Sequence, residues 1–255
     1  MIVAANTCKG KVILKAIAGA RNTAAAAATA AWWNNKKIKN KNNSNSNRIA
    51  TTNTNTKIRH IQDFINEIPD AVYRRKIEKI EPGAVDDPVA RLFRQSELSP
   101  TDDWLKYAIF NEDKPYTRNL ISTDHETYTL LLLCWNPEQE SPIHDHPSDG
   151  CWLQVLEGSI KEVRYDKELK TIAELEYNHG ELSYITDNIG YHKISSNNKK
   201  RAVTLHLYAP PFDTCHCWYS DTANPSEPCI GHTIHHSEYG VVLVKEEDAG
   251  DDIAA

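Results

Sequence analysis

The sequence predicts a mainly β barrel or sandwich preceded by a few short helices. Over residues 58–68 the apolar side chains recur every three or four positions, which indicates an amphipathic helix. From Tyr116 onward the hydrophobic period changes to two, and turn residues separate the short segments. Many short strands without helices between them favour a sandwich or barrel over an alternating α/β fold.

Three helices are expected before the strands. The first covers residues 58–68 and is ended by Pro69, because proline interrupts helical hydrogen bonding. The second covers 88–93, where Asp87 can cap the helix and a proline follows it. A Ser-Pro pair can open the third helix, over residues 100–107.

The strands follow in close succession. We expect them at 116–122, 126–135, 151–157, 159–165, 171–177, 181–187, 190–196, 201–209, 213–219, 230–236 and 239–244. These limits predict a folded domain at residues 57–245, followed by an acidic C-terminal tail at 246–255.

Residues 1–56 differ in composition from the rest of the chain. They contain an Ala-rich run and then an Asn/Lys/Ser tract at 34–48. Such tracts bury too little apolar surface to offset the entropy of ordering, so we expect a disordered extension. The alternative is a mitochondrial targeting segment in residues 1–33, which is basic, acid-free and Ala-rich but has Arg21 as its single arginine.

The charge distribution argues against nucleic acid as a partner. Residues 1–62 hold eleven of the 29 Lys and Arg and no acidic residue, so the remaining 18 stand against all 35 acidic residues. A domain this acidic does not neutralise phosphates. No apolar run reaches the roughly 18–20 residues that span a bilayer, so we expect no membrane association.

The cysteines do not form the regular framework of a small secreted domain. They lie at positions 8, 134, 151, 215, 217 and 229, without a CxxC pair. We therefore expect free thiols in a reducing compartment, the cytoplasm.

An HxH pair, His144 and His146, is a candidate metal site. Side chains alternate along an extended segment, so both imidazoles lie on one face and can bind one metal. His192 could supply a third imidazole from a later strand. The alternative is two solvated loop histidines, because a chain with eleven histidines contains such a pair easily by chance.

Two segments resemble the two motifs of the cupin superfamily, a double-sheet jelly-roll barrel that holds a metal inside. His144, His146 and Gly158 fit the first motif, and His192 fits the second, whose Pro is absent here. Cys151 occupies the position of the Glu ligand in the first motif. The resemblance implies a cupin jelly-roll barrel with a few N-terminal helices.

The exchange of a Glu ligand for Cys151 has a chemical consequence. Three neutral imidazoles leave a divalent metal its full positive charge, which favours an anionic ligand such as a substrate thiolate, and a thiolate suits iron. A three-histidine zinc hydrolase with a metal-bound water is the competing interpretation.

Tyr116 and Arg118 lie on the first predicted strand and point the same way. If Arg118 enters the barrel, its buried guanidinium needs an anion, and its planar fork matches a carboxylate. A surface arginine is the alternative.

A later strand, residues 203–208, alternates strictly between apolar and polar side chains. Thr204, His206 and Tyr208 share its polar face. Such a face normally meets water, but in a barrel that holds a ligand it can line the cavity instead.

Taken together, these segments resemble a thiol dioxygenase of the cupin superfamily, most closely the cysteine dioxygenases of the animal type. The resemblance covers about residues 57–245 and rests on YTRN at 116–119, LCW at 133–135, HDH at 144–146, Cys151, GYH at 190–192, LHLY at 205–208 and PPFDTCH at 210–216.

The resemblance implies an iron site and a substrate clamp. His144, His146 and His192 would bind Fe(2+), and Arg118, helped by Tyr116, would hold the carboxylate of L-cysteine.

The resemblance also implies a cofactor made from side chains. Cys151 and Tyr208 would join through a thioether, and we expect them to meet across the barrel. His206 would hydrogen-bond Tyr208. The family has Ser where this chain has Thr204, whose added methyl could shift His206, and Cys215 matches a family cysteine near the pocket mouth.

The implied reaction is the oxidation of L-cysteine by O₂ to 3-sulfino-L-alanine, the first step of cysteine catabolism towards hypotaurine and taurine. We expect a monomer. A dioxygenase for another small thiol, such as 3-mercaptopropionate, and a non-catalytic metal-binding cupin are the alternatives.

Overall fold

The computed structural model describes residues 57–98, 103–196, 199–219 and 226–243, so the expected extension 1–56 and the acidic tail 246–255 lie outside the described residues. The elements in the described part of the chain are α2 (Ile61–Glu78), α3 (Pro88–Gln95), the 3₁₀ turn η1 (Leu105–Tyr107), β1 (Tyr116–Thr123), β2 (Thr129–Trp135), β3 (Ile143–His144), β4 (Cys151–Glu157), β5 (Ser159–Tyr165), β6 (Thr171–Asn178), β7 (Leu182–Ile185), β8 (Tyr191–Ser196), β9 (Ala202–Tyr208), β10 (Thr214–Trp218), β11 (Cys229–His232), β12 (Ser237–Glu238) and β13 (Val241–Val242).

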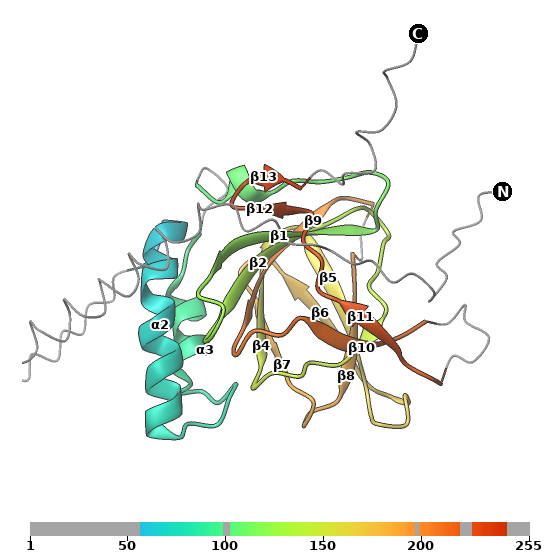
Figure 1. The fold of residues 1–255 in the computed structure, drawn as a ribbon, viewed down its shortest axis with the longest axis horizontal. Helices are drawn as coiled ribbons and strands as arrows, with labels where there is room; N and C mark the ends of the chain where they lie inside the picture. Colours follow the sequence, from blue (N-terminus) through green and yellow to red (C-terminus); the bar gives the residue numbers. More distant parts are fainter. Residues whose placement is uncertain (1–56, 99–102, 197–198, 220–225, 244–255) are drawn as a thin grey trace, which may run out of the picture. The chain divides into compact units, whose positions relative to one another are not determined.

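The strands form two sheets that face each other (Figure 1). One has the order β13-β12-β1-β2-β9-β4-β7 and is called the β2 sheet below. The other has the order β11-β10-β3-β8-β5-β6 and is called the β8 sheet. The predicted mainly β architecture, a cupin barrel with few helices, is confirmed.

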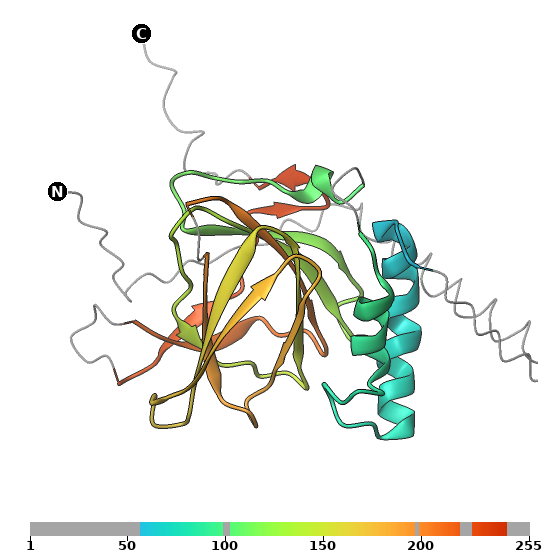
Figure 2. The same cartoon turned by 180° about the vertical axis from the view of Figure 1, so that it is seen from behind.

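The β2 sheet is buried on both faces, which explains the long apolar run in its sequence. Leu130 and Leu132 on β2 belong to a cluster that includes the helices, whereas Leu131 and Leu133 belong to the cluster between the sheets. Both helices lie on one side of the barrel, outside this sheet (Figures 1 and 2). Side chains alternate along a strand, so the helices cover only the outer face of this sheet. Its inward face can therefore line a site inside the barrel.

The cap of α3 ties the helix layer to the sheet. Asp87 accepts a hydrogen bond from the backbone N–H of Val89 at 3.0 Å, as predicted for an N-cap. Its second oxygen accepts from the indole Nε1 of Trp152 on β4 at 2.8 Å. One carboxylate therefore fixes both the start of α3 and its position against β4.

The prediction that Pro69 ends the first helix is wrong, because α2 continues to Glu78 with Pro69 inside it. Proline in a helix interior costs about 3 kcal/mol. Ile68 and Val72 flank it and are almost fully buried, and burying such a side chain contributes about 1.5–3 kcal/mol. The apolar stripe on both sides of the proline outweighs the lost hydrogen bond.

Other differences from the prediction concern short elements. The expected helix 100–107 appears only as the turn Leu105–Tyr107 within the described residues. Sequence alternation missed β3 and β12, which are too short to show a period. β2 begins at Thr129 instead of residue 126, because Asp124 accepts backbone hydrogen bonds from the next residues and forms a turn there.

No helix in the described segments of the chain has the length and apolar character needed to cross a membrane.

Candidate metal centre and pocket

His144, His146 and His192 come together inside the barrel. His144 ends β3 and is the register partner of His192 on β8, and His146 follows two residues later. The ring centroids are 4.9, 4.7 and 4.6 Å apart, so the rings form a nearly regular triangle. Among the described residues this is the one group of three metal-ligating side chains whose ligand atoms lie within 4.8 Å of each other.

Hydrogen bonds orient two of the three rings. Nδ1 of His144 lies 3.0 Å from the carbonyl oxygen of Pro142, and Nδ1 of His192 lies 2.7 Å from Glu162 Oε1. A carbonyl or carboxylate oxygen only accepts, so each Nδ1 carries the proton and each Nε2 keeps a lone pair for a metal.

The third ring supports a metal site for a different reason. Both ring nitrogens of His146 are buried and have no hydrogen-bond partner in the described structure. Leaving a buried polar group unpaired costs about 1–3 kcal/mol, and metal coordination would remove that cost for one of the two nitrogens. The donor set therefore fits a divalent metal ion.

Two of the three imidazoles, those of His144 and His146, are in the protonation state that metals require. Burial, followed by the neighbouring His192, lowers the pKa of His144 to about 3. The same causes hold the pKa of His146 well below its usual value. Both rings are therefore neutral near pH 7 and can coordinate without first losing a proton.

The residue between the two HxH histidines anchors the segment. Asp145 points to the other side and accepts hydrogen bonds from the backbone N–H and Nδ1 of His216, at 2.7 and 2.6 Å. Asp187 accepts from the backbone N–H of His146 at 2.6 Å. These contacts fix the HxH backbone from both sides, and they pair His216 with a carboxylate.

Arg118 and Tyr116 line the same pocket as His144 and His192. The Arg118 guanidinium carbon lies 5.8 Å from the ring centroid of Tyr208, and its Nε is buried without a hydrogen-bond partner in the described residues. The structure thus gives Arg118 the interior position that the sequence left open. A buried guanidinium with a free donor is suited to a small anion.

A chain of hydrogen bonds runs along the inward face of β9. The Trp135 indole donates to Thr204 Oγ1 at 2.8 Å, and Thr204 Oγ1 lies 2.8 Å from His206 Nε2. His206 Nδ1 lies 3.4 Å from the Tyr208 hydroxyl. The polar face of this strand therefore lines the interior, and the Thr204 methyl leaves the contact with His206 intact.

This chain also indicates the tautomer of His206. An indole N–H only donates, so the hydroxyl proton of Thr204 is available to His206 Nε2. Nδ1 then carries the ring proton and donates towards Tyr208. Burial, then Arg118, lowers the pKa of His206 well below its usual value, which keeps the ring neutral.

Cys151 and Tyr208 are neighbours within one sheet. They are register partners on β4 and β9, so the prediction that they meet across the barrel is wrong. The physical reason is that β4 and β9 pair directly, and paired positions face the same side. Both side chains approach the same ring nitrogen, with Cys151 Sγ 3.9 Å and the Tyr208 hydroxyl 3.4 Å from His206 Nδ1.

Both groups carry their protons in this arrangement. Burial raises the pKa of Cys151 to about 12, and the contact with Tyr208 only partly opposes that rise. Burial, then Cys151, raises the pKa of Tyr208 well above its usual value.

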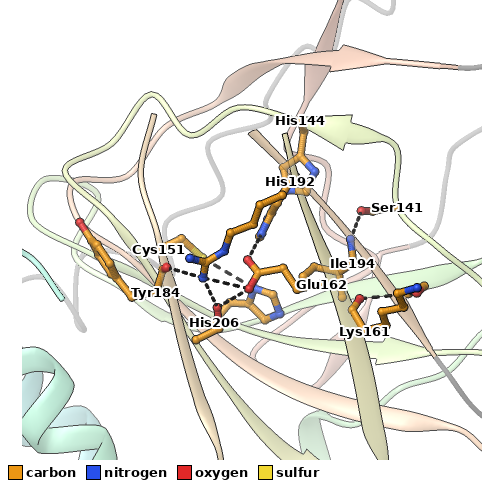
Figure 3. A network of polar contacts seen from close by, with 12 residues as sticks. Ser141, His144, Cys151, Lys161, Glu162, Tyr184, His192, Ile194 and His206 are labelled. Carbon is orange, nitrogen blue, oxygen red and sulfur yellow. Dashed lines mark hydrogen bonds and ion pairs between the residues drawn. The ribbon is translucent and has the colours of Figure 1, made fainter. Parts of the chain in front are cut away.

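Glu162 on β5 is a buried carboxylate that the sequence interpretation missed. Figure 3 shows it beside His192, to which a dashed line joins it. Ser183 Oγ and Arg164 Nη2 donate to its Oε2 at 2.8 and 3.0 Å. Burial alone would raise the pKa of Glu162, but the contacts with His192 and Arg164 lower it to about 2. Glu162 is therefore a carboxylate throughout the physiological range.

A signal for Glu162 was present in the sequence. Alternation on β5 places it on the same face as Ile160, which packs in the core between the sheets. A charged residue two positions from an inward-facing apolar residue indicates a buried, paired charge.

Cys215 and Cys217 lie together on β10, with their sulfur atoms 3.7 Å apart. Cys217 is the register partner of His144, so both thiols are on the metal side of the barrel. Cys215 is close enough to Arg118 to interact with its charge, in agreement with its expected place near the pocket.

Fold and site together define a cupin barrel with a candidate three-histidine metal centre. The sequence profile of the family described as "Cysteine dioxygenase type I" matches residues 77–221, a range that includes all the pocket residues named above. The chain therefore belongs to the cysteine dioxygenase type I family.

Individual relatives agree with this assignment. The chain is 34% identical to human "Cysteine dioxygenase type 1" over 162 residues, which is 61% of this chain and 78% of the human protein. It is 33% identical to the rat protein of the same name over the same length and coverage. Among solved structures, a double-stranded β-helix domain protein from Klebsiella pneumoniae aligns with a TM-score of 0.36 and 15% identity, covering 44% of this chain and 90% of that one.

Proposed function

We propose that the protein is an Fe(II)-dependent dioxygenase that converts L-cysteine and O₂ to 3-sulfino-L-alanine. The observation that carries the proposal is one pocket lined by Arg118 and by two members of the three-histidine cluster, with the Arg118 Nε buried and without a hydrogen-bond partner among the described residues. Membership of the cysteine dioxygenase type I family supports it. The substrate thiol gains both oxygen atoms, so the reaction balances without an organic redox cofactor.

His144, His146 and His192 would hold the iron. When bound, iron would supply a centre where the substrate thiol and O₂ can react side by side. All three proposed ligands are imidazoles, and Cys151 stands where a carboxylate ligand would otherwise lower the charge of the metal site. That charge favours a substrate that binds as a thiolate.

Arg118 would bind the substrate carboxylate. Its planar fork matches a carboxylate bidentately, and burial strengthens the interaction because water does not compete. Tyr116 stacks on Trp135 with centroids 4.6 Å apart, which holds the phenol beside Arg118 on the same wall. A substrate held at its carboxylate would direct its thiol towards the histidines.

We further propose that Cys151 and Tyr208 form a thioether. The cross-strand pairing supports this, since the bond would join side chains that are register partners and lie in one core cluster. One C–S bond replaces an S–H and a ring C–H, and the two hydrogens and two electrons pass to O₂. The Nδ1–H of His206 would then donate to the Tyr208 oxygen, which fixes the phenol beside the metal.

We propose a monomer in the cytoplasm, with L-cysteine and O₂ as its partners. The free thiols of Cys134, Cys151, Cys215, Cys217 and Cys229 among the described residues support a reducing compartment.

The decisive experiment is oxygen uptake by the iron-loaded protein with L-cysteine, cysteamine and 3-mercaptopropionate. We expect L-cysteine to be preferred and its product to gain two oxygen atoms by mass spectrometry. Protein loaded with zinc is the control and should take up no oxygen. Preference for 3-mercaptopropionate would assign a different small thiol, and metal binding without turnover of any thiol would indicate a non-catalytic cupin.

A further inference from the structure

Glu162 belongs to no part of the reaction described so far, yet its carboxylate contacts the imidazole of a proposed metal ligand. We propose that Glu162 is a positioning residue that holds His192 through its Nδ1 proton and returns to the metal site the negative charge that Cys151 does not provide. The inference rests on the proposed metal function of the three histidines.

The contact is a short hydrogen bond between fully buried groups. Nδ1 of His192 lies 2.7 Å from Glu162 Oε1, and both side chains are shielded from solvent. Register explains the contact, because Arg164 is the partner of His192 on the neighbouring strand and Glu162 lies two residues before it on the same face. The pair is thus fixed by the β5–β8 ladder.

The other oxygen of Glu162 is held equally firmly. Oε2 accepts from Ser183 Oγ and Arg164 Nη2, and that Nη2 also donates to the carbonyl oxygen of Tyr184 at 2.9 Å. Rotating the carboxylate would break contacts on both oxygens. Glu162 therefore presents Oε1 to His192 in one fixed orientation.

The three imidazoles consequently differ as donors. His192 donates its proton to an anion, His144 donates to a neutral carbonyl, and His146 has no partner in the described residues. A carboxylate on the far nitrogen makes an imidazole a stronger metal donor. His192 should be the strongest of the three ligands for this reason.

The position of the charge is what distinguishes this site from one with a carboxylate ligand. A Glu at position 151 would bind the metal directly and occupy a coordination position. Glu162 instead acts through His192, so it adds negative charge and leaves that position to substrate or O₂. The alternative is that Glu162 serves only as the ion-pair partner of Arg164.

A measurement of metal affinity distinguishes a role of Glu162 in tuning His192 from a role only as the ion-pair partner of Arg164. Glu162→Gln keeps the size and one hydrogen-bond acceptor but removes the charge. The matched control is Glu174→Gln, which removes an exposed carboxylate from the neighbouring strand β6. Co(II), which is visible by absorption, serves as the probe in competition with a chelator, and the midpoint potential of bound iron is measured in parallel.

We expect Glu162→Gln to weaken Co(II) binding about 10–100-fold and to raise the iron potential, because Fe(III) loses more stabilisation than Fe(II). Glu174→Gln should bind like the wild type. If Glu162→Gln fails to fold, Arg164→Met is added to remove the unpaired cation, and the double variant is measured against Arg164→Met alone. Wild-type affinity and potential after loss of the Glu162 charge would overturn the proposal and leave only the ion-pair role.

These measurements need neither cysteine nor O₂. A wild-type protein that binds Co(II) but oxidises no thiol would reject the proposed function alone. Equal binding by Glu162→Gln and wild type would reject this inference alone.

Discussion

The two walls of the barrel contribute different chemistry. The β8 sheet, with the residues that follow β3, carries the three histidines and Glu162. The β2 sheet carries Arg118, Cys151, His206 and Tyr208, the side chains proposed to handle the substrate, on β1, β4 and β9. Metal binding and substrate handling are therefore separable by mutation.

The walls also differ in how they are supported. The β2 sheet has a helix-covered outer face and rigid packing on both sides, so its inward side chains are held by the core. On the β8 sheet, the outer strand β6 is exposed on one face and only partly buried on the other. The histidines there are held by individual hydrogen bonds that they donate to Pro142, Glu162 and Asp187. We therefore expect single substitutions to disturb the histidine cluster on the β8 sheet more than the side chains on the β2 sheet.

Replacing a metal ligand should have the largest effect. His144→Ala, His146→Ala and His192→Ala each remove one of three donors, so we expect loss of bound iron together with loss of oxygen uptake. Iron content and oxygen consumption are measured on the same samples. His232→Ala, an exposed histidine on β11 of the same sheet, is the matched control and should keep both. Full iron content in any of the three variants would remove that residue from the ligand set.

Replacing Arg118 on the β2 sheet should reduce turnover but leave the metal in place. We expect Arg118→Ala to lower kcat/KM for L-cysteine by about two to three decades, because losing one partner of a buried charge pair costs on the order of 3–4 kcal/mol. Cysteamine, which lacks a carboxylate, should be nearly unaffected. Arg201→Ala, at an exposed surface ion pair, is the control. Equal losses for both thiols would show that Arg118 does not bind the carboxylate.

The Cys151–Tyr208 pair should give a smaller effect on rate and a distinct effect on mass. Protein incubated with iron, cysteine and O₂ should lose about 2 Da when the thioether forms, since two hydrogens leave. Cys151→Ser should abolish this change and retain iron and part of the activity. Tyr208→Phe should cost more, because the phenol that His206 contacts is also removed. Peptide mapping that recovers only separate Cys151 and Tyr208 peptides from wild-type protein would rule out the link.

Removing residues 1–56 should have the smallest effect of all. Every side chain proposed for catalysis and both walls of the barrel lie beyond them. A protein starting near Thr56 should turn over L-cysteine at a rate close to that of the full chain. Loss of folding on truncation would contradict the predicted domain boundary. A fluorescent fusion of residues 1–56 tests the targeting alternative separately, and a diffuse cytosolic signal would exclude it.

Local sequence was sufficient for most of the β fold, whereas the pocket residues were named only with the help of the family resemblance. Alternation placed the strands within a few residues of their observed positions, and the HxH spacing singled out two of the three clustered histidines. Local sequence failed where the structure of a segment depends on residues far away in the chain. Pro69 lies inside α2 because Ile68 and Val72 pack against a core that local propensity does not reveal.

The sequence alone determined which chemistry the chain offers: three imidazoles, a guanidinium, a thiol and a phenol on segments of known period. Only the tertiary structure decided how these groups act on each other. It paired β4 with β9, which makes Cys151 and Tyr208 neighbours, and β5 with β8, which places Glu162 behind His192. The physical reason is that alternation fixes which face a side chain takes, whereas strand pairing across the chain fixes what it meets there.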